Sequence, residues 1–184
     1  MKKVFIIHGF EGSPNGGWRS WLMGKLNTQN VYACALAMPS PKAPMCDEGV
    51  EEIRRNIERD SSDEIYLVGH SLGVPAILRY LESSEVKAVV RGAVLVSGPS
   101  EKTANRKVDS FLENPFNYAL IKSRVGTFVI IHGDNDQNVP LSHAESLAKK
   151  LNGELIIIKN GGHLNGSAGW FTLPECLDAL NQMF

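Results

Sequence analysis

The chain has 184 residues, of which 43% are hydrophobic and 21% charged, a composition typical of a globular protein with a single core. Its formal net charge of −1 provides no positive field for a phosphate backbone, so we expect no nucleic-acid partner. The length predicts one domain over residues 1–184. The 3 cysteines are widely spaced and no secretory signal is evident, which favours the cytoplasm. No apolar run reaches about 20 residues, so we expect no membrane partner.

Six short runs of apolar, β-branched residues predict strands, and most are continuously apolar, as in parallel strands that are buried on both faces. In chain order these runs cover residues 4–7, 31–37, 65–68, 93–96, 127–131 and 155–158. Segments with helical spacing lie between them, at residues 18–26, 47–59, 72–81, 142–151 and 173–183. The alternation predicts a doubly wound α/β fold of about six parallel strands with helices on both faces.

Helix ends and loops add detail to this prediction. Asp47 and Ser142 stand where N-caps are expected, and Pro174 fits a first helical turn. Residues 98–124 break the alternation and are predicted to form a small cap at the carboxyl edge of the sheet. Since ligands of open α/β sheets bind outside the carboxyl ends of the strands, the loops at that edge are where a site is expected.

The loop after the third predicted strand reads Gly69-His70-Ser71-Leu72-Gly73, a Gly-x-Ser-x-Gly pattern between a strand and a helix. A sharp strand-to-helix turn would expose the serine hydroxyl, and Gly69 and Gly73 would permit the close approach of the two elements. The N-terminus of the following helix would favour a developing negative charge. The alternative is a Gly-Ser turn without chemistry.

The loop after the fifth predicted strand, residues 132–140, contains two carboxylates, Asp134 and Asp136. A carboxylate there can accept a hydrogen bond from a histidine ring and hold its tautomer. The spacing does not choose between the two aspartates, and a polar loop or a helix cap would explain either one taken singly.

His163 follows the last predicted strand, after Gly161-Gly162. A lone loop histidine is more often solvated than catalytic. The chain order Ser71, an aspartate and then His163, each just beyond a strand, is nevertheless the order expected for a serine hydrolase on such a sheet. A serine hydroxyl needs a base of this kind to act as a nucleophile at neutral pH.

The loop after the first predicted strand begins His8-Gly9-Phe10. The backbone N–H groups of Phe10 and Leu72 are the candidate donors to an oxyanion. The remaining histidines are interpreted as structural (His8, His70, His132) or as a surface residue (His143).

Four segments, residues 8–18, 69–73, 132–140 and 161–170, resemble the α/β-hydrolase superfamily. The chain looks most similar to the small serine hydrolases that include retinoblastoma-binding protein nine. The resemblance implies a strand order of 2-1-3-4-5-6, Ser71 as nucleophile, His163 as base and Asp136 as the acid. Asp134 and His70 would then be supporting residues.

These patterns lead to the hypothesis of a serine hydrolase that cleaves small or medium carboxylic esters, with amides and thioesters as poorer substrates. The substrate is thus a small acyl compound, and neither a cofactor nor a metal is expected. The aromatic candidates for its pocket, for several of which core packing is the alternative, are Phe10, Trp18, Phe111, Phe116, Tyr118 and Trp170. A second hypothesis is a protein-binding module on a hydrolase scaffold with weak or no catalysis, because a fold alone guarantees no activity.

Overall fold

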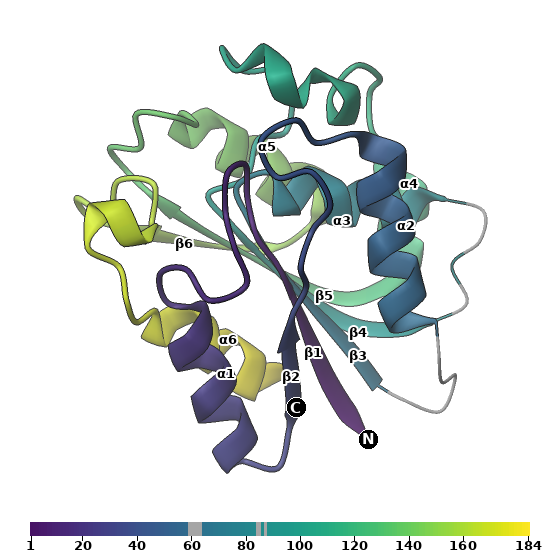
Figure 1. The fold of residues 1–184 in the computed structure, drawn as a ribbon, viewed down its shortest axis with the longest axis vertical. Helices are drawn as coiled ribbons and strands as arrows, with labels where there is room; N and C mark the ends of the chain where they lie inside the picture. The colour runs from purple at the N-terminus through teal and green to yellow at the C-terminus, as the bar shows by residue number, and fades with distance from the viewer. Residues whose placement is uncertain (59–63, 84–85, 87) are drawn as a thin grey trace.

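A six-stranded parallel sheet forms the centre of the molecule, in the order β2-β1-β3-β4-β5-β6, which confirms the predicted topology (Figure 1). The computed structural model describes residues 1–58, 64–83, 86 and 88–184. The strands are β1 (Lys2–Ile7), β2 (Tyr32–Ala35), β3 (Glu64–His70), β4 (Val89–Val96), β5 (Val125–Gly133) and β6 (Glu154–Ile158). The helices are α1 (Arg19–Thr28), α2 (Cys46–Ile57), α3 (Gly73–Glu82), α4 (Tyr118–Ser123), α5 (Leu141–Leu151) and α6 (Pro174–Met183), with two 3-10 turns, η1 (Arg106–Phe111) and η2 (Gly166–Ala168).

Helices cover both faces of the sheet, as the alternation of strands and helices predicts (Figure 1). One apolar cluster joins α2, α3 and α5 to one face, and a second joins α1 and α6 to the other. The middle strands are therefore buried on both sides, which explains their continuous apolar runs. Among the described residues, no helix is long and apolar enough to cross a bilayer.

The predicted helix ends are correct in part. Pro174 lies in the first turn of α6, as expected. Asp47 and Ser142 are not the N-caps, because α2 and α5 begin earlier and leave both residues inside the first turn, where the acidic Asp47 still favours the helix dipole. The predicted end of the second helix at Arg59 lies outside the described residues.

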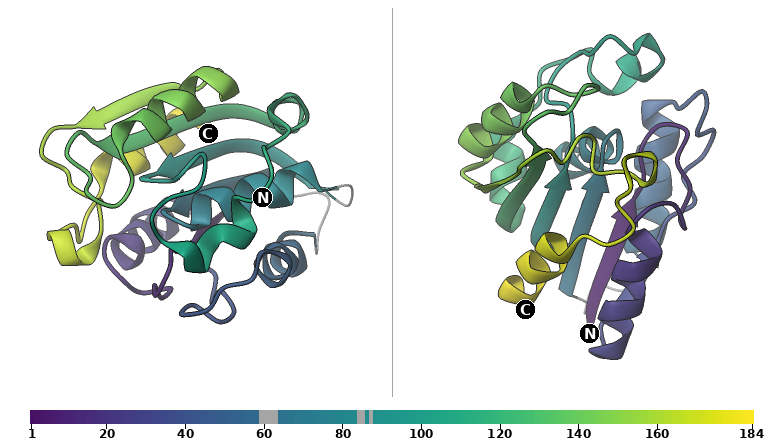
Figure 2. Two further views of the ribbon diagram at one scale, coloured as in Figure 1. Left: turned by 90° about the horizontal axis from the view of Figure 1, so that it is seen from above. Right: turned by 90° about the vertical axis from the view of Figure 1, so that its left-hand side faces the viewer.

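The first part of residues 98–124, which includes η1, forms the expected small cap above the carboxyl ends of the strands (Figure 2). The second part contains α4, which packs beside α3 and α5 and leads back to the start of β5. Two charged residues of α3 hold both parts. The Arg79 guanidinium donates to the carbonyl oxygen of Phe111 (2.9 Å) and pairs with Glu82, which accepts from the N–H of Asn117 (2.8 Å). The cap is therefore attached to the helix that follows Ser71.

Candidate active site

Ser71 stands in the turn between β3 and α3, with a left-handed backbone conformation (φ 54°) that L-residues adopt only under constraint. Its N–H donates to the carbonyl oxygen of Val96 (2.9 Å). A Cβ at Gly73 would collide with the carbonyl oxygen of Ile7, so only glycine lets α3 start this close to β1. The turn thus has the geometry that exposes a serine hydroxyl at the edge of a sheet.

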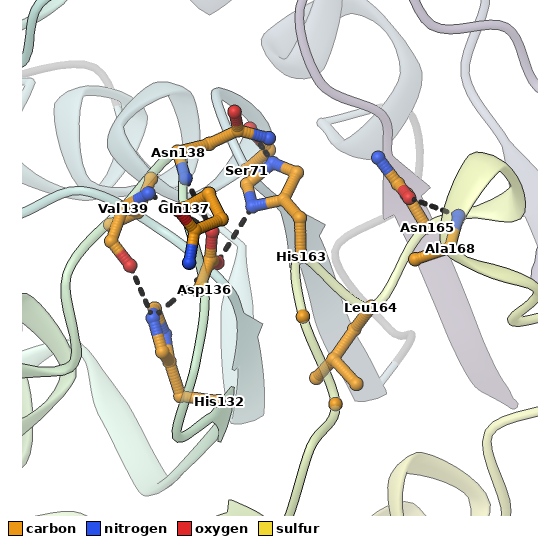
Figure 3. Close-up of polar contacts among 12 residues, drawn as sticks. Ser71, His132, Asp136, Gln137, Asn138, Val139, His163, Leu164, Asn165 and Ala168 are labelled. Carbon is orange, nitrogen blue, oxygen red and sulfur yellow. Dashed lines mark hydrogen bonds and ion pairs between the residues drawn. The ribbon is translucent and has the colours of Figure 1, made fainter.

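A continuous hydrogen-bonded chain joins three loops at this edge (Figure 3). The Oγ of Ser71 lies 2.9 Å from Nε2 of His163, which follows β6. The Nδ1 of His163 lies 2.7 Å from Oδ2 of Asp136, which follows β5. With Nδ1 as the donor to the carboxylate, Nε2 is free to accept the proton of the Ser71 hydroxyl.

The surroundings of Asp136 favour its charged form. Its side chain is fully buried, and its Oδ1 accepts from the N–H groups of Asn138 (2.8 Å) and Val139 (3.1 Å). Burial acts to raise the pKa of Asp136, but the hydrogen bond and charge of His163 and the two backbone bonds outweigh it, so the pKa lies below its ordinary value. An ionised carboxylate is therefore available to orient His163.

Asp134 is placed differently, although it is only two positions away in the loop. Its side chain is exposed, and its Oδ1 accepts from the N–H of Asn160 at 2.7 Å. The neighbouring Asn135 accepts from the N–H of Gly162 at 2.7 Å. Both side chains thus hold the loop that carries His163, while Asp136 contacts the ring itself.

Three further side chains hold the same loop from the other side. Trp18 donates from Nε1 to the carbonyl oxygen of Leu164 (2.8 Å), and Trp170 donates to that of Gly161 (2.7 Å). The Nε2 of His70 lies 3.0 Å from the carbonyl oxygen of His163 and, since a carbonyl only accepts, must carry the proton. Trp18 and Trp170 therefore position the His163 loop and do not line the cavity beside Ser71, contrary to expectation.

The backbone N–H groups of Phe10 and Leu72 have no hydrogen-bond acceptor among the described residues. Leu72 directly follows Ser71 and precedes α3, and Phe10 follows Gly9. A Cβ on Gly9 would lie 2.8 Å from Cβ of Ser71, so a glycine is needed for the loop after β1 to come this close. These two N–H groups stay our candidate donors to an oxyanion.

A cavity of about 350 Å³ opens beside Ser71 and His163. Its apolar lining comes from Phe10, Leu72, Pro99, Ala104, Val108 and Val139, and its polar lining from Thr103, Asn105, Gln137, Asn138 and Asn165. Several of these residues lie in the cap, which the sequence patterns could not resolve residue by residue. The cap therefore forms one wall of the cavity.

The other aromatic candidates also lie away from this cavity. Phe111 is buried in the core, and its ring would lie 3.2 Å from a Cβ placed on Gly49 of α2. Phe116 is buried under the Arg79 guanidinium, 4.0 Å from its ring centroid, and packs edge-on against Tyr118. Of the six aromatic candidates only Phe10 lines the cavity, because the others attach the cap or the His163 loop to the core.

The chain matches a model of one protein family, described as serine hydrolase, over residues 4–182. It belongs to that serine hydrolase family. It is 32% identical to YdeN of Bacillus subtilis (strain 168) over 184 residues, which cover 100% of this chain and 96% of that protein. It is also 22% identical to the serine hydrolase RBBP9 of Rattus norvegicus, over 90% of this chain and 88% of that protein.

The fold of this serine hydrolase is shared with its relatives. The crystal structure of the ydeN gene product from B. subtilis superposes with a TM-score of 0.94 at 32% identity, covering 100% of this chain and 99% of that one. The likeness confirms the resemblance to small α/β-hydrolases. It also extends over the cap, since the whole chain is covered.

One histidine of the hydrolase differs from its sequence-based interpretation. His143 was expected at the surface, but it is only 7% exposed, and its Nδ1 lies 3.1 Å from the N–H of Ser100. It accepts that hydrogen bond and so ties α5 to the start of the cap. Among the described residues, no group of three or more His, Cys, Asp or Glu side chains could hold a metal ion.

We expect the hydrolase to lose stability as the pH falls below about 6.5, because His70 is buried without charge. Burial, with a smaller effect of the nearby His163 ring, lowers the pKa of His70 from 6.5 to about 3. Between these values the unfolded chain binds a proton at His70 that the folded chain does not, so His70 alone lowers the free energy of unfolding by about 1.4 kcal/mol per pH unit as the pH falls. Urea unfolding between pH 7.5 and 5 measures this slope.

The matched variant is His70→Gln, whose side-chain amide nitrogen lies about where Nε2 of the imidazole lies and can still donate to the carbonyl oxygen of His163. It should flatten the pH dependence by about one proton. Burial also lowers the pKa values of His8, His132 and His143, so a smaller slope should remain. The same slope in both proteins would contradict the assignment to His70.

Proposed function

We propose that this serine hydrolase cleaves small or medium carboxylic esters through an acyl-enzyme on Ser71, with amides and thioesters as poorer substrates. The observation that carries the proposal is the hydrogen-bonded chain from Ser71 through His163 to the buried Asp136. A serine hydroxyl needs a base at its oxygen and an orienting group behind that base to act as a nucleophile. The proposed site has both.

In the first half of the proposed reaction, Nε2 of His163 takes the proton of Ser71 as Oγ attacks the ester carbonyl carbon. The carbonyl π electrons move to the oxygen, and the N–H groups of Phe10 and Leu72 stabilise the resulting oxyanion. When the tetrahedral intermediate collapses, the bond to the alkoxide breaks and His163 returns its proton to the leaving group. Asp136 keeps the ring oriented and stabilises its transient positive charge.

In the second half, water replaces the alcohol. His163 takes a proton from a water molecule as the water oxygen attacks the acyl carbon. When the second intermediate collapses, the bond between the acyl carbon and Oγ of Ser71 breaks, His163 returns the proton to Oγ, and the acid is released. The same donors serve both intermediates, because the oxyanion forms at the same place. Neither half requires a metal or a cofactor.

The cavity supports a preference for short acyl groups. Its volume of about 350 Å³ lies at the lower end of ligand sites, and Val108 of the cap forms part of its wall. The apolar side chains of Leu72 and Val139 face the same space and suit an aliphatic group. The cap is attached to α3 by Arg79, which keeps this wall in place.

We expect a fluorophosphonate probe to label the folded protein at Ser71, which peptide mapping by mass spectrometry would locate. With p-nitrophenyl acetate, butyrate, octanoate and palmitate, kcat/KM should be highest for a short or medium chain and about tenfold or more lower for palmitate. If the folded protein neither reacts with the probe nor hydrolyses any ester, the proposed ester hydrolysis is wrong. A protein-binding module on this scaffold would then be the better description.

A further inference from the structure

Arg19, the first residue of α1, is a buried cation in this hydrolase. It is only 6% exposed, and its Nε donates to the carbonyl oxygen of Ser13 at 3.0 Å. Within the described ranges it forms no ion pair with a carboxylate. A guanidinium carries five N–H donors, and the described residues provide an acceptor for one of them.

A buried guanidinium without a negatively charged partner is energetically unfavourable unless another group accepts its remaining hydrogen bonds. Charged side chains are almost never fully buried without a partner, because burial removes their hydration. Desolvation lowers the pKa of Arg19 to about 10, which leaves the side chain charged at neutral pH. A missing anion would explain why this charge is kept in the interior.

Arg19 lines a second hollow next to the reacting groups, and none of its guanidinium nitrogens is among the fully buried atoms that lack a partner. This hollow has a volume of about 170 Å³ and is lined by Arg19 together with Ser71, His163 and His70. It shares Ser71, His163, Phe10 and Asn165 with the larger cavity. A compound bound at Ser71 can therefore extend into it.

The charges around the second hollow favour an anion inside it. His70 is neutral, because burial lowers its pKa to about 3, and burial likewise lowers the pKa of the nearby His8. Glu11 also lines the hollow, but its side chain is exposed to solvent, where its charge is screened. Arg19 is thus the charged side chain held inside, and a planar carboxylate fits its donors better than a phosphate dianion close to Glu11.

We propose that the second hollow binds a carboxylate of the substrate through Arg19, so that the preferred esters carry a carboxylate a few atoms from the bond that is cleaved. This inference rests on the proposed ester hydrolysis at Ser71. It adds a specificity-determining residue that lies outside the hydrogen-bonded chain. The simpler role, in which Arg19 only holds the loop at Ser13, predicts no dependence on substrate charge.

The test compares esters that differ only in charge. One pair is mono-p-nitrophenyl adipate and its methyl ester, with the carboxylate on the acyl side, and the other is 4-acetoxybenzoate and its methyl ester, with the carboxylate on the leaving group. In at least one pair the wild type should have a kcat/KM at least about tenfold higher for the acid. Arg19→Gln should lower kcat/KM for that acid about 10- to 100-fold, mainly through KM, and change the neutral ester less than about threefold.

The matched control is Lys25→Gln, which removes a positive charge from an exposed position of the same helix and should leave both members of each pair unchanged. Arg19→Lys should retain part of the preference, because a lysine can still pair with a carboxylate but not through two parallel bonds. An equal loss for acid and neutral ester, or no preference in the wild type, would overturn the inference.

A binding measurement keeps this test separate from the proposed reaction. In the Ser71→Ala variant, which retains Arg19, mono-p-nitrophenyl adipate should bind at least about tenfold more tightly than its methyl ester by equilibrium titration. If the acid binds more tightly but the wild type hydrolyses no ester, the proposed ester hydrolysis is wrong and the proposed carboxylate site is supported. If esters are hydrolysed but neither binding nor turnover prefers the acid, the carboxylate site alone fails.

Discussion

Replacing Ser71 with alanine is expected to lower kcat for p-nitrophenyl butyrate by on the order of 10⁶-fold. The variant lacks the oxygen that attacks the carbonyl, while His163, Asp136 and the oxyanion donors stay in place. A small residual rate should remain, because those donors still stabilise attack by water. Initial-rate kinetics with enough enzyme to detect slow turnover, together with loss of fluorophosphonate labelling, measures the effect.

Ser97→Ala is a matched control for this variant. Ser97 is also a serine with a left-handed backbone (φ 49°), and it directly follows β4. It is fully buried and lines neither hollow beside Ser71. Its replacement should change kcat by less than about tenfold, and a Ser71→Ala protein that keeps its activity within that range would show that the nucleophile lies elsewhere.

Asp136→Asn is expected to lower kcat by on the order of 10⁴-fold without unfolding the protein. An amide can keep a hydrogen bond to His163, but it carries no charge to stabilise the imidazolium and can donate to Nδ1, which selects the wrong tautomer. The consequence is that Nε2 no longer accepts the Ser71 proton. Ester kinetics measure the loss, and circular dichroism shows whether the fold is retained.

Asp134→Asn is the control for the choice between the two aspartates. Asp134 is exposed and accepts from the N–H of Asn160, and an asparagine oxygen can accept the same hydrogen bond. We therefore expect its kcat to fall less than about tenfold. The reverse ranking of the two variants would mean that Asp134, and not Asp136, orients His163.

Much of the fold could be predicted because its signals are local. Residues 65–68 and 127–131 are continuously apolar, which identifies strands that are covered on both faces. Gly69 and Gly73 around Ser71 identify a tight strand-to-helix turn. Gly73 is needed there because α3 starts close to the carbonyl oxygen of Ile7. Since parallel strands end at one edge of a sheet, the loops after them were expected to meet.

The partners of individual side chains could not be predicted in the same way. Asp134 and Asp136 have the same chemistry two positions apart, so residue spacing does not choose between them. The family resemblance implies Asp136, and in the packed loop it is Asp136 that contacts His163. Trp18 and Trp170 looked like pocket residues, yet both donate to the loop around His163. Each of these outcomes depends on where a second segment of the chain lies.

The sequence by itself therefore determined the α/β class and the set of loops on which chemistry was expected, because hydrophobic periodicity and turn geometry act over a few neighbouring residues. Only the tertiary structure decided that His143 is buried and that Arg19 lies buried beside Ser71, and it placed Asp136, which the family resemblance named, in contact with His163. The physical reason is that hydrogen bonding and desolvation depend on distances between segments far apart in the chain. Residue spacing along the sequence does not encode those distances.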